Sequence, residues 1–301
     1  NITAILDLNG KTLKVTGGAG TYGGGRAIKM EAGNLTIKNG TIDGRSYDGE
    51  ILNPHSSGTG WSSTRVGGCL RVSGGSATLD NVTMYNNDSW GSGIMMESGS
   101  GTLTVNNCTF SSLYGTSITC GDYNTETLST GYNAVTNIYN CTFTQEGIPT
   151  DDMNFNAACL ASQYGATINV YGDTRATGEN AFAIFSSGGE INVYGGTYSA
   201  KHYIVNSYGV QEGIYYGVYA NVAQVNLYDG TFTDLNTDVA FKFNNDNHNA
   251  ILITGGTFNV NPYPKVNHET HDVWKNDETS VKYIVVEKNA SHEGYNTQVT
   301  N

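Results

Sequence analysis

An eight-residue pattern that returns nine times constrains the fold of this chain more than any other feature. The starts of successive copies lie 23 to 42 residues apart, a spacing typical of repeat architectures. Numbered 1 to 9 in chain order, the copies are LDLNGKTL (6–13), LTIKNGTI (35–42), ATLDNVTM (77–84), LTVNNCTF (103–110), TNIYNCTF (136–143), INVYGDTR (168–175), INVYGGTY (191–198), VNLYDGTF (225–232) and ILITGGTF (251–258).

Each copy has the alternation of a strand with one buried face. Position three is always Leu, Ile or Val, whereas positions two and four are mostly polar. Position five holds Gly, Asn or Asp, which tolerate positive φ, so we expect a sharp bend there in every copy. Position seven is Thr in all nine copies, and a second strand is expected to follow the bend.

A third short strand is indicated by alternating apolar stretches that precede most copies, such as 27–30, 69–72 and 182–185. One copy cannot cover its own apolar face, so neighbouring copies must stack at about 4.8 Å. The sequence therefore predicts an all-β fold, a parallel β-helix solenoid of about nine to ten coils over residues 1–260. Residues 261–301 are richer in charge and are expected to form a C-terminal cap or linker segment.

Two stretches carry a resemblance to a known class of proteins. GGCLRVSGGSATLDNVTMYNN (67–87) and GSGIMMESGSGTLTVNNCTF (91–110) resemble the repeats of bacterial surface proteins of the polymorphic outer-membrane type. More broadly, about 1–260 resembles the right-handed parallel β-helices of the pectate-lyase-like superfamily. That resemblance and the usual crossover handedness imply a right-handed coil. The superfamily includes lyases, hydrolases, tailspikes, adhesins and stalks, so the resemblance implies a fold and not one function.

The composition argues against nucleic acid and membranes as partners and against a disulfide framework. The chain has 27 acidic and 15 basic residues, a net charge of −12, which repels phosphate backbones and argues against nucleic acid. No apolar run approaches the roughly 18 residues of a membrane span, so membrane insertion is not expected. The five Cys imply no disulfide framework, and the stacked pair Cys108 and Cys141 is expected to stay reduced.

Copies 5 to 8 share a polar pattern that the other copies lack. Each has Asn at position two and Tyr at position four: Asn137/Tyr139, Asn169/Tyr171, Asn192/Tyr194 and Asn226/Tyr228. Both positions should face away from the core, which makes a flat strip of amides beside stacked phenol rings, roughly 14 Å long. We name these eight residues the Asn/Tyr strip. Aromatic rings beside amides suit sugar rings and protein partners, and the alternative is that the tyrosines only stabilise the sheet.

Candidate acid–base residues lie in or near the polar insertions 121–135 and 144–157. Glu146, Asp151 and Asp152 are the available carboxylates, and Arg175 stands where eight other copies have an apolar residue. Arg175 is therefore either paired inside or redirected outward. The clusters that enzymes of the resembling superfamily carry, a Gly-His-Gly or an Arg-x-Lys segment, are missing from the sequence.

A run of polar residues near the end, His268, Glu269, His271 and Asp272, lacks the spacing of a zinc or calcium site, so no metal and no cofactor is expected. We therefore expect a non-enzymatic, extracellular or cell-surface module that binds a glycan or a host or partner protein through the Asn/Tyr strip. The alternatives are a polysaccharide-degrading tailspike, lyase or hydrolase, and a structural spacer or filament subunit that self-associates through its solenoid ends.

Overall fold

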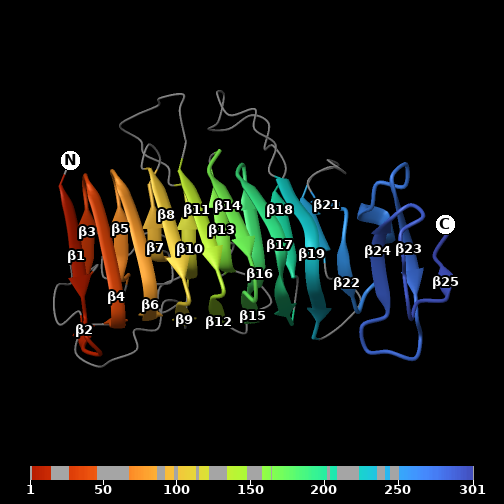
Figure 1. Ribbon diagram of the computed structural model, residues 1–301, viewed down its shortest axis with the longest axis horizontal. Coiled ribbons are helices and arrows are strands. Elements are labelled where there is room, and N and C mark those ends of the chain that lie inside the picture. The colour runs from red at the N-terminus through yellow and green to blue at the C-terminus, as the bar shows by residue number, and fades with distance from the viewer. Residues whose placement is uncertain are drawn as a thin grey trace, which may run out of the picture.

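The computed structural model of the 301-residue chain describes residues 2–14, 27–45, 68–86, 92–97, 101–112, 115–121, 134–147, 158–163, 165–201, 204–208, 224–235, 241–244 and 251–300. These residues form a long stack of strands that ends in a smaller group of strands near the C-terminus (Figure 1). The strands fall into a 17-stranded and an 8-stranded sheet.

The larger sheet begins with one column of strands, each paired in parallel with the next. In order the column runs through β1 (Thr3–Asp7), β4 (Asn34–Asp43), β6 (Ser76–Asn86), β8 (Thr102–Asn106), β11 (Val135–Tyr139), β14 (Thr167–Tyr171), β17 (Glu190–Ala200), β19 (Gln224–Asp234) and β21 (Ile251–Ile253). These strands contain the first half of the nine motif copies.

A second column of the same sheet contains the residues after the bend. It is formed by the later halves of β4, β6, β17 and β19, together with β2 (Thr12–Lys14), β9 (Thr109–Ser112), β12 (Thr142–Gly147), β15 (Arg175–Asn180) and β22 (Gly256–Phe258).

The smaller sheet is a third parallel column. Its order is β3 (Ile28–Met30), β5 (Leu70–Val72), β7 (Ser92–Met96), β10 (Thr116–Cys120), β13 (Ala158–Gln163), β16 (Phe182–Ser187), β18 (Val205–Tyr208) and β20 (Phe241–Asn244). The predicted all-β class and the parallel stacking of the copies are confirmed, and the arrangement is compatible with a parallel β-solenoid. The handedness and the superfamily stay predictions.

The pairing changes after β22. A short 3₁₀ helix, η2 (Tyr263–Lys265), leads to three antiparallel strands, β23 (His271–Lys275), β24 (Tyr283–Glu287) and β25 (Thr297–Gln298). β24 pairs antiparallel with β22 and with β23, so a strand of opposite direction covers this edge of the larger sheet.

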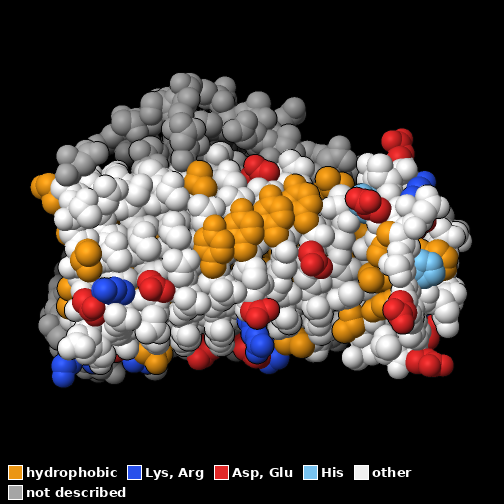
Figure 2. Space-filling view, viewed as in Figure 1, with side chains coloured by type: hydrophobic (Ala, Val, Ile, Leu, Met, Phe, Trp, Pro, Cys, Tyr) orange, Lys and Arg blue, Asp and Glu red, His pale blue; other side chains and the backbone are white. Residues whose placement is uncertain are grey.

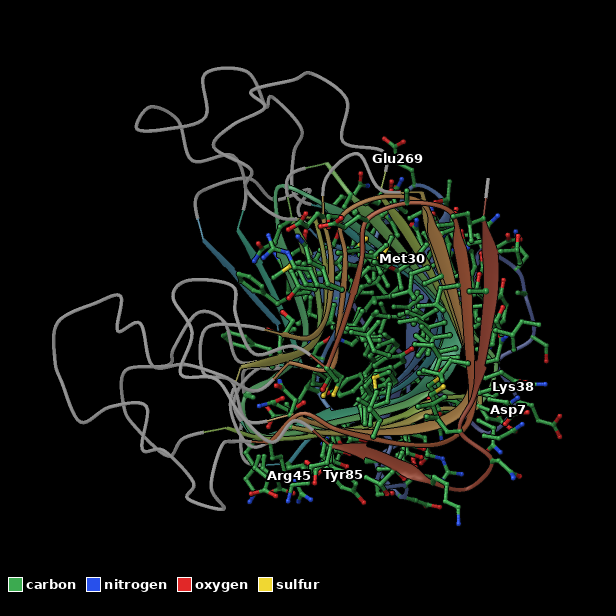
Figure 3. All side chains as sticks on the ribbon, turned by 90° about the vertical axis from the view of Figure 1, so that its left-hand side faces the viewer. Asp7, Met30, Lys38, Arg45, Tyr85 and Glu269 are labelled. Carbon is green, nitrogen blue, oxygen red and sulfur yellow. The ribbon has the colours of Figure 1, made fainter. Side chains whose placement is uncertain are left out.

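The core lies between the sheets and is filled by like positions of successive copies. Position three of copies 2 to 9 is fully buried and in register along the stack: Ile37, Leu79, Val105, Ile138, Val170, Val193, Leu227 and Ile253. Seen along the stack, Met30 lies in this interior, whereas Asp7 and Lys38 lie outside it (Figure 3). Aromatic residues of the second column also stack, as Phe110 and Phe143 do at 4.6 Å between ring centres.

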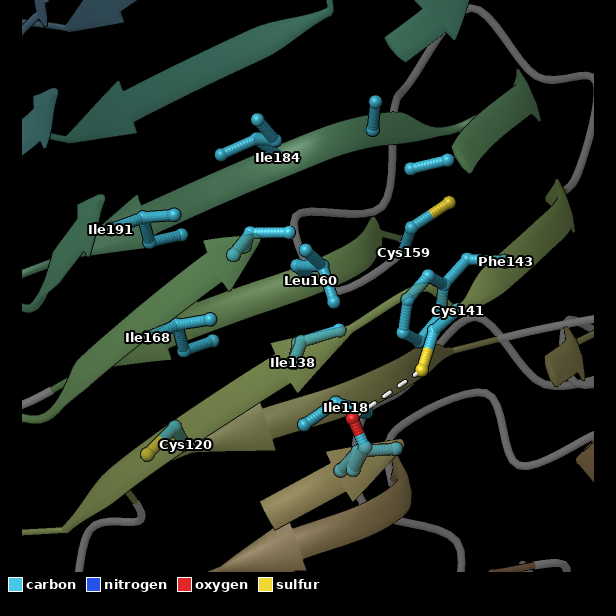
Figure 4. Packing of buried hydrophobic residues seen from close by; sticks show 14 of the residues in the cluster. Ile118, Cys120, Ile138, Cys141, Phe143, Cys159, Leu160, Ile168, Ile184 and Ile191 are labelled. Atoms are coloured by element: carbon cyan, nitrogen blue, oxygen red, sulfur yellow. Dashed lines mark hydrogen bonds between the residues drawn. The ribbon is translucent and has the colours of Figure 1, made fainter. Parts of the chain in front are cut away.

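All five cysteines are buried, and none of them forms a disulfide. Cys108 and Cys141 occupy position six of copies 4 and 5. The thiol of Cys141 donates to the carbonyl oxygen of Val105 at 3.5 Å (Figure 4). The thiols therefore act as small apolar residues of the core.

The expected bend is confirmed by backbone angles. Position five has positive φ in copies 1 to 6, at Gly10, Asn39, Asn81, Asn107, Asn140 and Gly172. In copies 7 to 9 the positive φ moves one residue on, to Gly196, Gly230 and Gly256. The Gly-Gly or Asp-Gly pair in these copies gives the chain a glycine at position six, which lets the bend form later.

In copies 1 and 6 the strand register differs from the one that the eight-residue motif predicts. In copy 1 Leu6, not Leu8, lies in register with Ile37, so the strand starts two residues earlier and the bend is longer. In copy 6 Arg175 pairs with Thr142 of copy 5, and Ala176 takes the core position beside Phe143. One extra residue at the bend therefore redirects Arg175 outward, where it is exposed.

Candidate functional site

The four tyrosines of the Asn/Tyr strip form one continuous stack on the outer face of the larger sheet. Ring centres are 4.9 Å apart between Tyr139 and Tyr171, 5.0 Å between Tyr171 and Tyr194, and 4.8 Å between Tyr194 and Tyr228. The ring planes of adjacent tyrosines lie within 12° of parallel. These separations are typical of offset-stacked rings and match the spacing of neighbouring strands.

The stack follows from register. β11 and β14 place Tyr139 opposite Tyr171, and the buried residues at position three fix which face each strand turns outward. Because β11, β14 and β17 are parallel and in register, each phenol repeats the one before it. Between β17 and β19 the register shifts after Val193, yet the rings of Tyr194 and Tyr228 still stack. An oblique band of hydrophobic side chains crosses the middle of this face in Figure 2, and the stacked tyrosines account for it.

The tyrosines are accessible. Tyr139, Tyr194 and Tyr228 expose 36%, 43% and 41% of their surface, and Tyr171 is half-buried. Leu235 is a further exposed large apolar side chain in this part of the chain. Three stacking steps make an aromatic surface about 15 Å long.

The asparagines form a second ladder beside the rings. Asn169 donates its amide to Asn137 Oδ1 at 3.0 Å, Asn192 donates to Asn169 at 3.1 Å, and Asn226 donates to Asn192 at 2.8 Å. Each interior amide therefore both donates to and accepts from its neighbours, which uses much of its hydrogen-bonding capacity. The ladder holds the copies together and orients the strip.

The asparagines at the copy 7 and copy 8 end of the strip are less exposed than the tyrosines. Asn192 and Asn226 are buried, with 7% and 4% of their surface exposed, although their position faces away from the core. These two amides therefore face outward as expected but are covered by neighbouring side chains. The amide of Gln224 donates to Asn226 Oδ1 at 2.9 Å, and Asn226 donates to Glu190 Oε1 at 3.2 Å, so longer neighbours surround this end of the ladder.

Burial sets the acidity of two phenols of the strip. Burial raises the pKa of Tyr228, with smaller contributions from the neighbouring phenol of Tyr194 and from the carboxylate of Glu190. Burial also raises the pKa of Tyr171, with added contributions from Tyr194 and Tyr139. The phenols of Tyr171 and Tyr228 are therefore neutral at physiological pH and present hydroxyl donors as well as aromatic surface.

The candidate acid–base residues are only partly described. Glu146 and Arg175 are both exposed, but Arg175 lies beside Thr142, four residues before Glu146 along β12. At the rise of an extended strand that places their backbones about 13 Å apart. Asp151 and Asp152 lie outside the described residues. The described part of the chain therefore does not bring Glu146 and Arg175 together.

The polar run near the end is used locally. The ring of His268 stacks on Tyr263, and its Nε2 lies 2.9 Å from the Tyr263 carbonyl oxygen. His271 is buried, and its Nδ1 lies 2.8 Å from Thr270 Oγ1. Within the described residues no group of three His, Cys, Asp or Glu side chains is arranged to hold a metal ion.

Sequence reasoning missed the residues that complete the strip. Glu190 and Gln224 precede their copies by one residue and lie opposite each other on β17 and β19, so the eight-residue motif does not include them. Their spacing of two residues from Asn192 and Asn226 places them on the same outward face, which is the signal that could have found them.

No family model matches the chain, and neither curated proteins nor solved structures give a significant match. Among the described residues, no helix is both long enough and apolar enough to cross a bilayer. The site therefore rests on its own geometry: an aromatic surface about 15 Å long, stiffened by an amide ladder, on a flat parallel sheet.

Proposed function

We propose that the chain is a right-handed parallel β-helix of a bacterial-type surface protein, and that it binds glycans without chemically altering them. The Asn/Tyr strip is the contact face, with the tyrosines touching the ligand and the asparagines holding them in register. In this proposal the module acts outside the cell or at the cell surface. The observation that carries the proposal is the continuous stack of four tyrosine rings, three of them exposed.

A glycan suits this surface for two reasons. Sugar rings have apolar faces that pack on aromatic side chains, and phenol hydroxyls can exchange hydrogen bonds with sugar hydroxyls. The face beside the strip also carries the threonines of position seven, of which Thr142 and Thr197 are exposed. A surface of phenols and hydroxyls on a rigid sheet can contact several residues of an oligosaccharide at once, without ordering a loop.

The test is glycan-array binding of the parent chain and of two quadruple variants. Replacing Tyr139, Tyr171, Tyr194 and Tyr228 by Ala removes the rings, whereas replacing the same four residues by Phe keeps the rings and removes the hydroxyls. We expect the Ala variant to lose glycan binding and the Phe variant to keep part of it. Circular dichroism and a urea unfolding curve check that each variant is folded.

The other interpretations give different results in the same experiment. A parent chain that captures a protein ligand and no glycan would make the strip a protein-binding surface. Release of reducing ends or unsaturated sugars from a polysaccharide would support an enzyme and contradict the proposal. A folded Ala variant that binds every glycan of the parent would also contradict it.

A further inference from the structure

The charged side chains around the Asn/Tyr strip are predominantly acidic. Glu190 lies at one side of the strip and accepts a hydrogen bond from Asn226, and Asp229 directly follows Tyr228 and lies opposite Tyr194 in the strand pairing. Asp173 follows Tyr171 by two residues and is exposed at the bend. Carboxylates thus flank both long sides of the stacked rings, and acidic side chains are visible on both sides of the oblique band in Figure 2.

Few cations balance these carboxylates. Between residues 136 and 232, the described residues include two basic side chains, Arg175 and Lys201. Lys201 is ion-paired with Glu179, and Arg175 lies on the far side of the bend from the tyrosines. The chain as a whole carries a net charge of −12. A positively charged ligand therefore meets a favourable potential here, and an acidic polysaccharide meets repulsion.

The rings themselves favour a cation. The faces of aromatic rings carry partial negative charge and attract an ammonium group within about 6 Å. Tyr194 and Tyr228 are the two most exposed rings of the strip, and Tyr228 ends the stack, so only one of its faces is covered by a ring of the strip. Asp229 directly follows Tyr228, whereas the Glu190 carboxylate lies farther along the same outward face, beside Asn226. An ammonium group against the outer face of Tyr228 would have an aromatic ring on one side, Asp229 nearby and Glu190 farther along the strip.

We propose that the glycan recognised by the strip is an amino-sugar oligosaccharide with free amines, whose ammonium groups lie along the Tyr228 end of the strip and are attracted by Asp229 and Glu190. This inference rests on the proposed function and names the class of glycan. The sugar rings pack along the remaining tyrosines, and the amines select this glycan from neutral ones.

A basic peptide would offer the same charge but fits the surface less well. Peptides that add to sheets do so at an open edge, where backbone donors and acceptors are unpaired. The strip lies within the sheet, because β14 and β17 each pair with a neighbour on both sides. Only side chains are offered here, and they include the phenol hydroxyls of the strip and, across the bend, the hydroxyls of Thr142 and Thr197, which favours a sugar.

The experiment compares two ligands of equal length by isothermal titration calorimetry, a hexamer of β-1,4-linked glucosamine and its fully N-acetylated counterpart. Mildly acidic buffer keeps the free amines protonated. We expect the glucosamine hexamer to bind at least about fivefold more tightly than the N-acetylated hexamer, because ion pairs at exposed sites and cation–π contacts each contribute a modest factor. The preference should shrink at high salt.

Isosteric variants separate charge from shape. Glu190→Gln keeps the acceptor for Asn226, and Asp229→Asn keeps the acceptor for the Gly230 amide. The double variant should therefore fold and lose the preference for the free amines while it still binds the N-acetylated hexamer. A control variant, Glu278→Gln with Glu293→Gln, makes the same change in net charge at exposed sites of the C-terminal segment and should keep the preference.

The possible results are distinguishable. Equal binding of the two hexamers by the parent chain, or an unchanged preference in the double variant, would overturn the amino-sugar inference and leave glycan binding in place. Tighter binding of a lysine-rich peptide than of the glucosamine hexamer would overturn the choice of a glycan. No binding of either hexamer or of any glycan on the array would overturn both proposals.

Discussion

The rings of Tyr171 and Tyr194 lie 5.0 Å apart, centre to centre, and within 4° of parallel, although 22 residues separate them in the chain. Only the pairing of β14 with β17 brings them together. The strip is therefore a property of the stack and not of any single copy. Its stability and its recognition of ligands should depend on the number of consecutive copies that contribute a ring.

The first prediction concerns this dependence. Tyr171 stacks on two rings and Tyr139 on one, within the strip. Each stacked pair contributes about 0.5–1.5 kcal/mol beyond area burial. Tyr171→Ala should therefore lower the free energy of unfolding by about 1–3 kcal/mol and Tyr139→Ala by about half as much. Urea unfolding curves measure the two values, and equal losses would mean that stacking contributes little.

The bend allows a second prediction, on backbone conformation. Asn140 has φ of 53°, a region that costs an ordinary L-residue about 1–2 kcal/mol and costs glycine little. Asn140 Oδ1 also accepts a hydrogen bond from the Asp173 amide at 3.0 Å. Asn140→Gly and Asn140→Ala both lose that bond, but only the Ala variant adds strain. We expect Asn140→Ala to be less stable than Asn140→Gly by about 1 kcal/mol.

Gly172 occupies the same bend position in the next copy, and it tolerates a side chain less well than Asn140 does. A Cβ on Gly172 would lie 2.2 Å from Asn140 Oδ1, and φ there is 65°. Gly172→Ala should therefore destabilise the fold more than Asn140→Gly does. Similar thermal midpoints for these two variants would contradict the role given to the bend.

Sequence reasoning predicted the columns of the fold because alternation and strand pairing are local and repetitive. Position three and the asparagines of the strip lie in register along the stack, as the motif indicates. The tyrosines stack as well, although Asp229 and not Tyr228 lies opposite Tyr194 in the strand pairing. The alignment failed at copies 1 and 6, since a bend can absorb one or two extra residues while the flanking strands keep their alternation. The outward placement of Arg175 depends on one such residue.

The burial of Asn192 and Asn226 also could not be predicted from the eight-residue motif. It depends on the side chains of Glu190 and Gln224, which reach the ladder from one position before the copy. A one-dimensional pattern states which face a side chain is on but not how far a longer neighbour extends over it. The motif therefore does not show that the tyrosines, and not Asn192 and Asn226, are the part of the strip that a ligand can reach.

A third prediction follows from an amide in the core. Gln145 is fully buried, and neither Nε2 nor Oε1 has a hydrogen-bond partner within the described part of the chain. A buried polar group without a partner costs about 1–3 kcal/mol, and an apolar group of the same shape removes that cost. Gln145→Met should therefore leave the free energy of unfolding unchanged or raise it by up to about 2 kcal/mol.

The matched variant for this prediction is Gln145→Ala, which removes the amide but leaves a cavity and should be less stable than Gln145→Met. A loss of stability in Gln145→Met would show instead that the amide is satisfied in solution, as by a buried water. Urea unfolding at neutral pH measures all three proteins.

The fourth prediction concerns the thiols. All five cysteines are buried and outside any disulfide, and burial raises the pKa of Cys120 to about 12. The thiolate is the reactive form, so alkylation should be slow in the native protein and complete in denaturant. Intact mass should show five modified thiols after unfolding and no change on adding reductant alone. A mass increase of two hydrogens on reduction would reveal a disulfide and contradict the structure.

The last prediction is a loss of stability at alkaline pH. Burial raises the pKa of Tyr198 above its ordinary value of 10.0, and its hydroxyl donates to the Gly195 carbonyl oxygen at 2.9 Å. Because the folded-state pKa is above the unfolded one, the unfolded chain loses this proton first. The contribution to stability is therefore fully present below pH 10 and falls as pH rises above it, by up to about 1.4 kcal/mol per pH unit for one tyrosine. Tyr198→Phe lacks this proton, so its free energy of unfolding should fall less steeply above pH 10, although it is lower at pH 8 by the lost hydrogen bond. Urea unfolding of both proteins at several pH values measures the slopes, and parallel slopes would show that Tyr198 ionises as easily in the folded protein as in the unfolded one.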